Sequence, residues 1–286
     1  MQFDTTKIKS NGFPVSFNGQ YENTPECSWG KDSIDDIRKK YQENGVLLIR
    51  NFFSRTEILG LRSFYFRKFR KTGLLDEKYK PVHGIYAGEG EHEGYGVKGH
   101  PAYSFVRHKV YLQFCHSQRL RKFVSDIMGL PMSILERKIV RHFIPGTSVS
   151  SKAHRDSSYF SEGNDVPCLN MWIPFGDCDE KTGFLIYLKN GHKIDVKSLT
   201  GKDGIMNNGK WISKEFAKLS ELTESPWFIS NYNAGDISIH FPDSIHGSTD
   251  CNTPDNTMRL TTDIRFVEES KNDPYWMKAW AGDDGF

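Results

Sequence analysis

Five short runs of β-branched and aromatic residues fill the second half of the chain, and they constrain the fold more than any other feature. Glycine, proline, asparagine and aspartate separate the runs, which is the pattern of strands joined by turns. A succession of such strands predicts a mainly β fold of the jelly-roll type. The runs cover residues 134–146, 168–176, 184–190, 236–242 and 259–267.

Helical patterns precede these strands. Ser33 suits the N-cap of a first helix whose apolar residues recur at helical spacing, and Gly45 suits its end. The apolar run at 46–50 then predicts a core strand. Two more helices are expected at about 56–72 and 117–128, because each is followed by a glycine. We therefore expect α-helices to flank the β structure.

Length and composition indicate one domain. A chain of 286 residues with 37% hydrophobic residues can bury a sizeable core, and β-barrels or jelly rolls of ~200–250 residues commonly form single domains. We expect this domain to cover residues 1–286, with an N-terminal arm at 1–30 and a C-terminal tail at 268–286. The aromatic tail should pack on the barrel or on a second subunit, so a monomer and a homodimer both remain open.

Several classes of protein do not fit this sequence. A net charge of +2 does not indicate a nucleic-acid binder. Five scattered cysteines do not indicate a disulfide framework or a structural zinc site. The first residues lack the uninterrupted apolar region that a signal peptide needs, and no stretch of the sequence approaches ~18 apolar residues. We expect a cytoplasmic protein with a small-molecule partner and without nucleic-acid or membrane partners.

The most informative polar pattern is His154, Asp156 and the distant His246. Ten histidines and 36 acidic residues predict about one His-x-Asp/Glu pair by chance, so the pair alone is a weak signal. Two imidazoles and one carboxylate, however, form the facial triad of non-haem iron sites, which leaves coordination positions open. On an extended strand His154 and Asp156 would project from the same face. Gly247 would leave room beside the metal, and His240 is expected to be a core histidine.

The stretch between these candidate ligands carries a family resemblance. Residues 169–193 read LNMWIPFGDCDEKTGFLIYLKNGHK, with Trp172 to Pro174 at a strand end, Thr182 and Gly183 at a bend, and Gly191 and His192 after an apolar strand. This order resembles the phytanoyl-CoA dioxygenase family of Fe(II)/2-oxoglutarate oxygenases. The resemblance extends from about Ile34 to Phe266 and implies a double-stranded β-helix, the cupin-like form of the jelly roll.

The resemblance also implies roles for individual residues. His154, Asp156 and His246 would hold Fe(II), with 2-oxoglutarate and O2 as cosubstrates. Arg259 would anchor the distal carboxylate of 2-oxoglutarate, because a guanidinium offers a planar, two-pronged donor. Three further residues are expected around this cosubstrate: Trp172, Ser248 and Thr261.

The position of the arginine departs from the family pattern. Arg259 lies 13 residues after His246, further than is usual, and a longer intervening loop would absorb the difference. Arg265 is the alternative anchor, although a salt-bridged surface arginine at a strand end is its expected role.

Asp156 bears on the reaction as well. Halogenating relatives replace this carboxylate with Gly or Ala, so an intact aspartate indicates oxygenation. The resemblance implies oxidation of an unactivated C–H bond, with release of succinate and CO2. Hydroxylation is expected, while desaturation and ring closure remain open.

The substrate is expected to be a small metabolite, and an anionic one remains open. Basic residues in 64–80 could attract a carboxylate or phosphate, although a solvated helix face is the simpler explanation. Segments 87–100 and 195–231 resemble mobile lids, with His92 and His100 as exposed loop residues. Four residues are predicted to line the substrate pocket: Tyr103, Arg141, Asn170 and Trp227.

Two other functions remain open. A jelly-roll protein with zinc or manganese could act without 2-oxoglutarate, and a relative without catalytic activity could bind or regulate. The presence of all three ligands together with Arg259 favours the iron enzyme over both.

Overall fold

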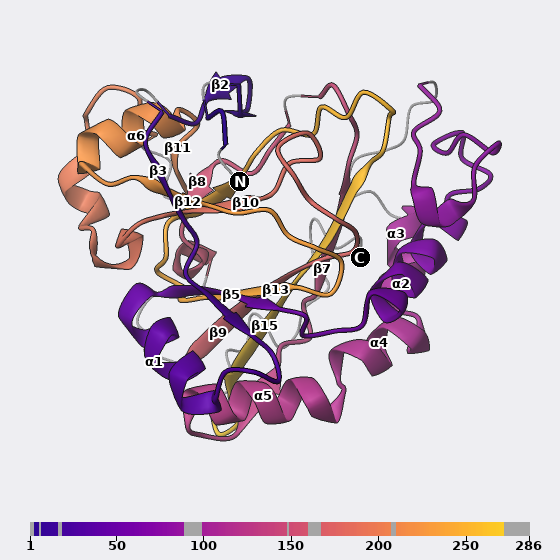
Figure 1. Cartoon of the computed structure of the whole chain (residues 1–286), viewed down its shortest axis with the longest axis horizontal. Helices are drawn as coiled ribbons and strands as arrows, with labels where there is room; N and C mark the ends of the chain where they lie inside the picture. The colour runs from indigo at the N-terminus through magenta and orange to yellow at the C-terminus, as the bar shows by residue number, and fades with distance from the viewer. Residues whose placement is uncertain are drawn as a thin grey trace.

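The computed structural model describes residues 3–5, 7–16, 19–88, 99–147, 149–159, 167–206 and 210–271. Within these ranges the chain forms two larger sheets with helices packed against the outside of one of them (Figure 1). The prediction of a mainly β jelly roll with flanking helices is confirmed.

The larger sheet is organised around the long strand β15. Its order is β4, β5, β13, β9, β15 and β6, and β7 also pairs with β15. Asp263 on β15 pairs with Trp172 on β9 and with Ile139 on β7. Alternate residues of β15 therefore share the face that looks toward the second sheet. The strands are β4 (Glu26–Ser28), β5 (Val46–Arg50), β6 (Met132–Ile134), β7 (Ile139–Phe143), β9 (Cys168–Pro174), β13 (Ile237–His240) and β15 (Arg259–Glu268).

The smaller sheet carries two of the candidate ligands. Its order is β11, β8, β14, β10, β12 and β3. The pairing of β8 with β14 sets His154 directly opposite His246, so a short hydrogen-bonded ladder joins histidines that are far apart in sequence. The strands are β3 (Tyr21–Asn23), β8 (Ala153–His154), β10 (Leu185–Leu188), β11 (Trp211–Ser213), β12 (Trp227–Ile229) and β14 (His246–Ser248).

The N-terminal arm belongs to both sheets. After a small hairpin of β1 (Lys9–Ser10) and β2 (Phe13–Pro14), β3 pairs in parallel with β12 and β4 pairs in parallel with β5. The arm thus supplies one edge strand to each sheet.

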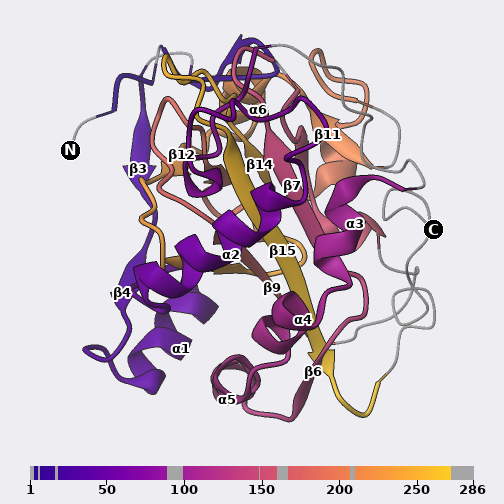
Figure 2. The same cartoon turned by 90° about the vertical axis from the view of Figure 1, so that its right-hand side faces the viewer.

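Helices cover the outer face of the larger sheet, and Figure 2 shows α2, α4 and α5 on this side. The first predicted helix is confirmed: Ser33 accepts a hydrogen bond from the Asp36 amide, and Gly45 ends the helix at φ 69°. The third is confirmed as well, whereas the second begins near the predicted residue and ends at Arg67, before Gly73. The helices on this side are α1 (Ile34–Asn44), α2 (Arg55–Arg67), α3 (Pro101–Val106), α4 (Lys109–Cys115) and α5 (Gln118–Met128), whereas α6 (Phe216–Thr223) packs with the smaller sheet.

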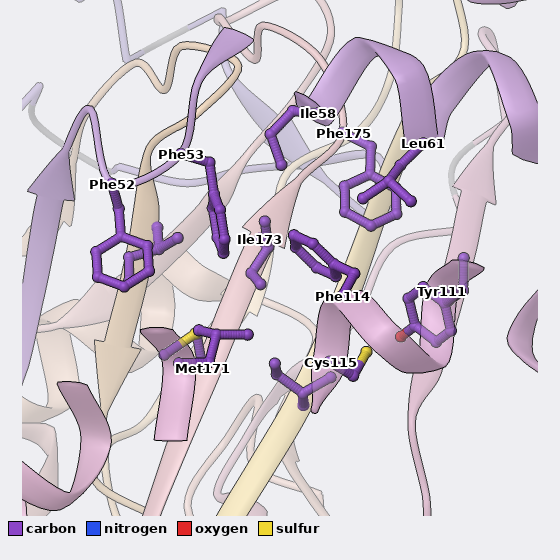
Figure 3. Packing of buried hydrophobic residues seen from close by; sticks show 14 of the residues in the cluster. Phe52, Phe53, Ile58, Leu61, Tyr111, Phe114, Cys115, Met171, Ile173 and Phe175 are labelled. Atoms are coloured by element: carbon purple, nitrogen blue, oxygen red, sulfur yellow. The ribbon is translucent and has the colours of Figure 1, made fainter. Parts of the chain in front are cut away.

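Side chains of β9 point alternately toward the helices and toward the space between the two sheets. Met171 and Ile173 face the helices and pack with Ile58 of α2 and Phe114 of α4 (Figure 3). Each of these side chains is largely or fully buried, and full burial of such a side chain contributes about 1.5–3 kcal/mol. Trp172, between them in sequence, therefore faces the opposite way, toward the second sheet.

Two predictions about loops were wrong. The described part of 195–231 is not a long loop, because it contains β11, α6 and β12, and β12 is a buried inner strand of the smaller sheet. His100 is not an exposed loop residue: it is 2% exposed, and its Nδ1 accepts a hydrogen bond from the Ala102 amide at the start of α3. His92 and the aromatic residues of the tail lie outside the described residues.

No helix in the described ranges is long and apolar enough to cross a membrane. The five cysteines are free and buried.

Candidate metal centre

His154, Asp156 and His246 meet at one point between the two sheets. Their ligand atoms all lie within 4.8 Å of one another. Asp156 Oδ1 is 3.6 Å from His154 Nε2 and 3.9 Å from His246 Nε2. Asp156 does not lie on an extended strand as predicted, because β8 ends at His154 and Asp156 begins the 3₁₀ turn Asp156–Tyr159. The turn, rather than strand alternation, brings the carboxylate toward the two imidazoles.

Backbone carbonyls orient both imidazoles. His154 Nδ1 lies 2.7 Å from the Lys152 carbonyl oxygen, and His246 Nδ1 lies 2.9 Å from that of Ser244. A carbonyl can only accept, so Nδ1 carries the proton in each ring and the lone pair is on Nε2. Burial lowers the pKa of His246 well below its usual value, which keeps this ring neutral. Neutral imidazoles with fixed orientation are the form that binds a metal ion.

Asp156 is anionic although it is buried. Burial by itself would raise the pKa of this carboxyl, but Arg265 and the surrounding histidines outweigh burial and hold the pKa well below its usual range. Arg265 Nη2 donates to Asp156 Oδ2 at 3.1 Å, and His240 Nε2 lies 3.6 Å from the same oxygen. Oδ1 is therefore the oxygen that faces His154 and His246.

The expected surface position of Arg265 was wrong. The residue is 6% exposed, and it contacts Asp156 instead of bulk solvent. His240 lies in the core, where its Nδ1 is 3.2 Å from the Tyr187 hydroxyl. Arg265 and His240 both lie at Oδ2 of Asp156, whereas His154 and His246 lie at Oδ1.

Arg259 lies fully buried at the start of β15. Its Nη1 donates to the Thr249 carbonyl oxygen at 2.7 Å, and its Nη2 lies 3.4 Å from Ser248 Oγ. The guanidinium carbon is 3.8 Å from the centre of the Phe143 ring, a cation–π contact. Its Nε has no hydrogen-bond partner among the described residues. A buried guanidinium with an unused donor is suited to a carboxylate ligand.

One cavity of about 680 Å³ joins these features. It lies between the sheets, and a volume of this size suits a small-molecule site. Its wall includes the three candidate ligands and all four residues predicted to surround the cosubstrate, namely Arg259, Trp172, Ser248 and Thr261.

Of the four predicted substrate contacts, Arg141 lies on the described wall of this cavity. Trp227 instead stacks on Phe216 in the core and donates its indole N–H to the Phe216 carbonyl. Asn170 is buried on β9 beside His240, and Tyr103 is buried in α3. The basic residues of 64–80 are mostly exposed, and none of them lines the described wall.

Sequence reasoning missed Asp263, Phe143 and Arg137, which also line the cavity. The alternation that grouped Thr261 with Arg259 extends along β15 to Asp263 and Arg265, so this signal was present in the sequence.

Gly247 is required for packing, not for space beside a metal. A Cβ at this position would overlap the Phe216 ring and lie 2.7 Å from the Ser151 carbonyl oxygen. The prediction that its missing side chain faces the metal was wrong.

Comparison with known proteins identifies the family and the fold. The profile of the phytanoyl-CoA dioxygenase (PhyH) family matches residues 41–260. No curated protein matches the sequence significantly.

Three experimentally determined structures illustrate the fold. The apoform of EctD from S. alaskensis has a TM-score of 0.60 at 13% identity, covering 92% of this chain and 89% of its own. The non-heme alpha-ketoglutarate-dependent carbocyclase SnoK from nogalamycin biosynthesis has a TM-score of 0.58 at 16% identity, covering 84% and 87%. The epimerase SnoN, determined with Fe3+, alpha-ketoglutarate and nogalamycin RO, has a TM-score of 0.57 at 15% identity, covering 82% and 83%. At these identities the likeness shows a common fold.

Proposed function

Because the chain belongs to the phytanoyl-CoA dioxygenase family, we propose that it is an Fe(II)- and 2-oxoglutarate-dependent oxygenase of a small molecule. The observation that carries the proposal is that His154, Asp156, His246 and Arg259 all face one cavity. The three candidate metal ligands alone, or the buried arginine alone, would not be sufficient to propose this function.

The donor set fits a ferrous ion. Two neutral Nε2 atoms and one carboxylate oxygen are the ligands of non-haem iron sites that keep positions open. When bound, the iron would supply the redox centre at which O2 and 2-oxoglutarate react. The protein holds each imidazole in place through a hydrogen bond from its Nδ1–H to the carbonyl of Lys152 or Ser244. It holds Asp156 through the hydrogen bond from Arg265 to Oδ2.

Arg259 would hold the distal carboxylate of 2-oxoglutarate. The Phe143 ring and the Thr249 carbonyl fix the guanidinium plane, so little conformational freedom is left to lose on binding. Ser248 and Thr261 would add hydroxyl donors, and Trp172 would flank the cosubstrate.

We propose hydroxylation as the reaction. Asp156 is present at the position that halogenating relatives leave empty, which favours oxygenation. The structural neighbours include an enzyme named as an epimerase and one named as a carbocyclase, so this fold supports several outcomes of C–H oxidation.

Buried, free thiols support a cytoplasmic location.

Anaerobic titration with Fe(II) and then 2-oxoglutarate tests the proposal. We expect a weak visible charge-transfer band from the chelate. His246→Ala should lose iron binding, whereas Arg259→Ala should retain iron and lose the band at moderate cosubstrate concentrations. His116→Ala is the matched control, because His116 ends α4 and is not on the described cavity wall; this variant should behave like the wild type.

The alternatives give different results. Iron binding without a band in the wild type would favour a metalloprotein that does not use 2-oxoglutarate. No metal binding at all would favour a protein without catalytic activity.

A further inference from the structure

Asp263 is a carboxylate on the cavity wall that the proposed chemistry does not use. It lies on the same face of β15 as Arg259, Thr261 and Arg265, and it lines the cavity. Among the described residues its carboxylate has no hydrogen bond or ion pair within 4.0 Å, although Arg265 is two residues away. Arg265 donates to Asp156 instead. Asp263 is half-buried, and carboxylates removed from water are normally paired, so its oxygens can accept hydrogen bonds from a donor on a ligand.

Apolar side chains flank Asp263 on the two neighbouring strands. Trp172 is its cross-strand partner on β9, and Ile139 is its partner on β7. Leu185 lines the cavity as well. Burial raises the pKa of Asp263, an effect opposed by Arg265 and Arg141. A bound cation would stabilise the charged form further.

Arg141 is a cation on the adjacent strand β7 that also lines the cavity. Its Cα partner on β15 is Thr261, so Arg141 and Asp263 are diagonal neighbours across β7 and β15. Diagonal positions are ~7–8 Å apart, within reach of long side chains. The wall thus presents one anion and one cation side by side.

We infer that the substrate is a small zwitterion whose protonated amine binds Asp263 and whose carboxylate binds Arg141. This inference rests on the proposed function and adds the class of substrate to it. Arg265, two residues along the same face, contacts the metal-binding Asp156. A molecule held by Asp263 would therefore lie within a few ångströms of the metal centre, where one of its C–H bonds can react.

A panel of matched compounds tests the inference with the Fe(II)- and 2-oxoglutarate-loaded enzyme. The probes are the common L-amino acids, the corresponding carboxylic acids without the amine, and the corresponding amines without the carboxylate. The readouts are the shift of the visible band on binding and the release of succinate. We expect at least one amino acid to bind about tenfold or more tightly than both of its truncated analogues, since hydrogen bonds between charged groups contribute about 1.5–3 kcal/mol.

Two variants separate the two contacts. Asp263→Asn should abolish the preference for the amine and retain the preference for the carboxylate, and Arg141→Met should do the reverse. Both should keep the band formed by Fe(II) and 2-oxoglutarate, which also reports that they are folded. Asp35→Asn, on the exposed first turn of α1, should leave both preferences unchanged.

The inference is overturned if no amino acid in the panel is preferred over its truncated analogues, or if Asp263→Asn leaves the preference for the amine intact. In either case a persistent charge-transfer band would leave the proposed oxygenase function standing. Absence of the charge-transfer band in the wild type would instead refute the proposed oxygenase function.

Discussion

A single methyl group at position 183 should damage both the stability of the protein and its cosubstrate site. Gly183 adopts φ +79° at the bend before β10. A Cβ there would overlap Arg259 Nη1 and would lie 2.5 Å from the Asp250 carbonyl oxygen and 2.8 Å from that of Thr249. Gly73 has the same φ of +79° and nothing within 4 Å of its built Cβ. The two alanine variants therefore differ in packing and not in backbone conformation.

The magnitude follows from this comparison. Alanine in the left-handed region costs roughly 1–2 kcal/mol, and Gly73→Ala should show this term alone. Gly183→Ala should add about 1–3 kcal/mol for overpacking, because two of its three close neighbours are backbone carbonyls that cannot swing away. We expect Gly183→Ala to lower the free energy of unfolding by about 2–5 kcal/mol in total.

Arg259 should move in the same variant. Displacing Nη1 breaks its hydrogen bond to Thr249 and misaligns the fork for a carboxylate. A charge-assisted hydrogen bond contributes about 1.5–3 kcal/mol, so the Kd for 2-oxoglutarate should rise about tenfold or more. Gly73→Ala should leave that Kd unchanged.

Urea unfolding and anaerobic 2-oxoglutarate titration of both variants provide the measurements. Equal unfolding free energies for Gly183→Ala and Gly73→Ala would refute the packing argument. A normal Kd in a clearly destabilised Gly183→Ala would refute the link between this glycine and the anchor.

Three further outcomes are expected. Arg259→Lys should weaken 2-oxoglutarate binding about tenfold or more, because a lysine cannot form the two-pronged contact. Arg62, a buried arginine on α2, donates to the backbone carbonyls of Val82 and Met258, and Arg62→Lys should lower the melting temperature only. Fe(II) at about 100 times its Kd should stabilise the protein by about 2.7 kcal/mol, reversibly with a chelator, and His246→Ala should abolish this response in thermal unfolding. Burial raises the pKa of the Cys115 thiol from 9.0 to about 12, so its contribution to stability is complete below pH 9 and is lost as the pH rises from 9 toward 12. Cys115→Ala should flatten the fall of unfolding free energy in that window by about 1.4 kcal/mol per pH unit, and an unchanged slope would contradict the assigned burial effect.

Local signals in the sequence were sufficient for the elements. Ser33 and Gly45 bound α1 because capping needs only a nearby side-chain oxygen and a left-handed residue. The five predicted runs correspond to β7, β9, β10, β13 and β15 because alternation and turn residues are local properties. The short helices α3, α4 and α6 were missed, since fewer than ten residues carry too little periodicity to be distinguished.

Burial was less accessible to sequence reasoning. Arg265 was expected at the surface because arginines usually are exposed, and only the turn at Asp156 provides the carboxylate that keeps it inside. Trp227 was predicted to line the pocket, with core packing as the default for an aromatic residue, and its stacking on Phe216 decides for the core.

The sequence by itself determined the chemistry available to this protein. It contains the residue types of a metal-binding triad, Arg259 as a candidate anchor for the 2-oxoglutarate carboxylate, and the strands that carry most of these residues. Only the tertiary structure decided how they meet. The β8–β14 register sets His154 opposite His246, and the β7–β15–β9 register lines Asp263 and Arg141 along the same cavity. Register depends on pairing between segments that are distant along the chain, and a shift of one residue would turn every one of these side chains to the other face.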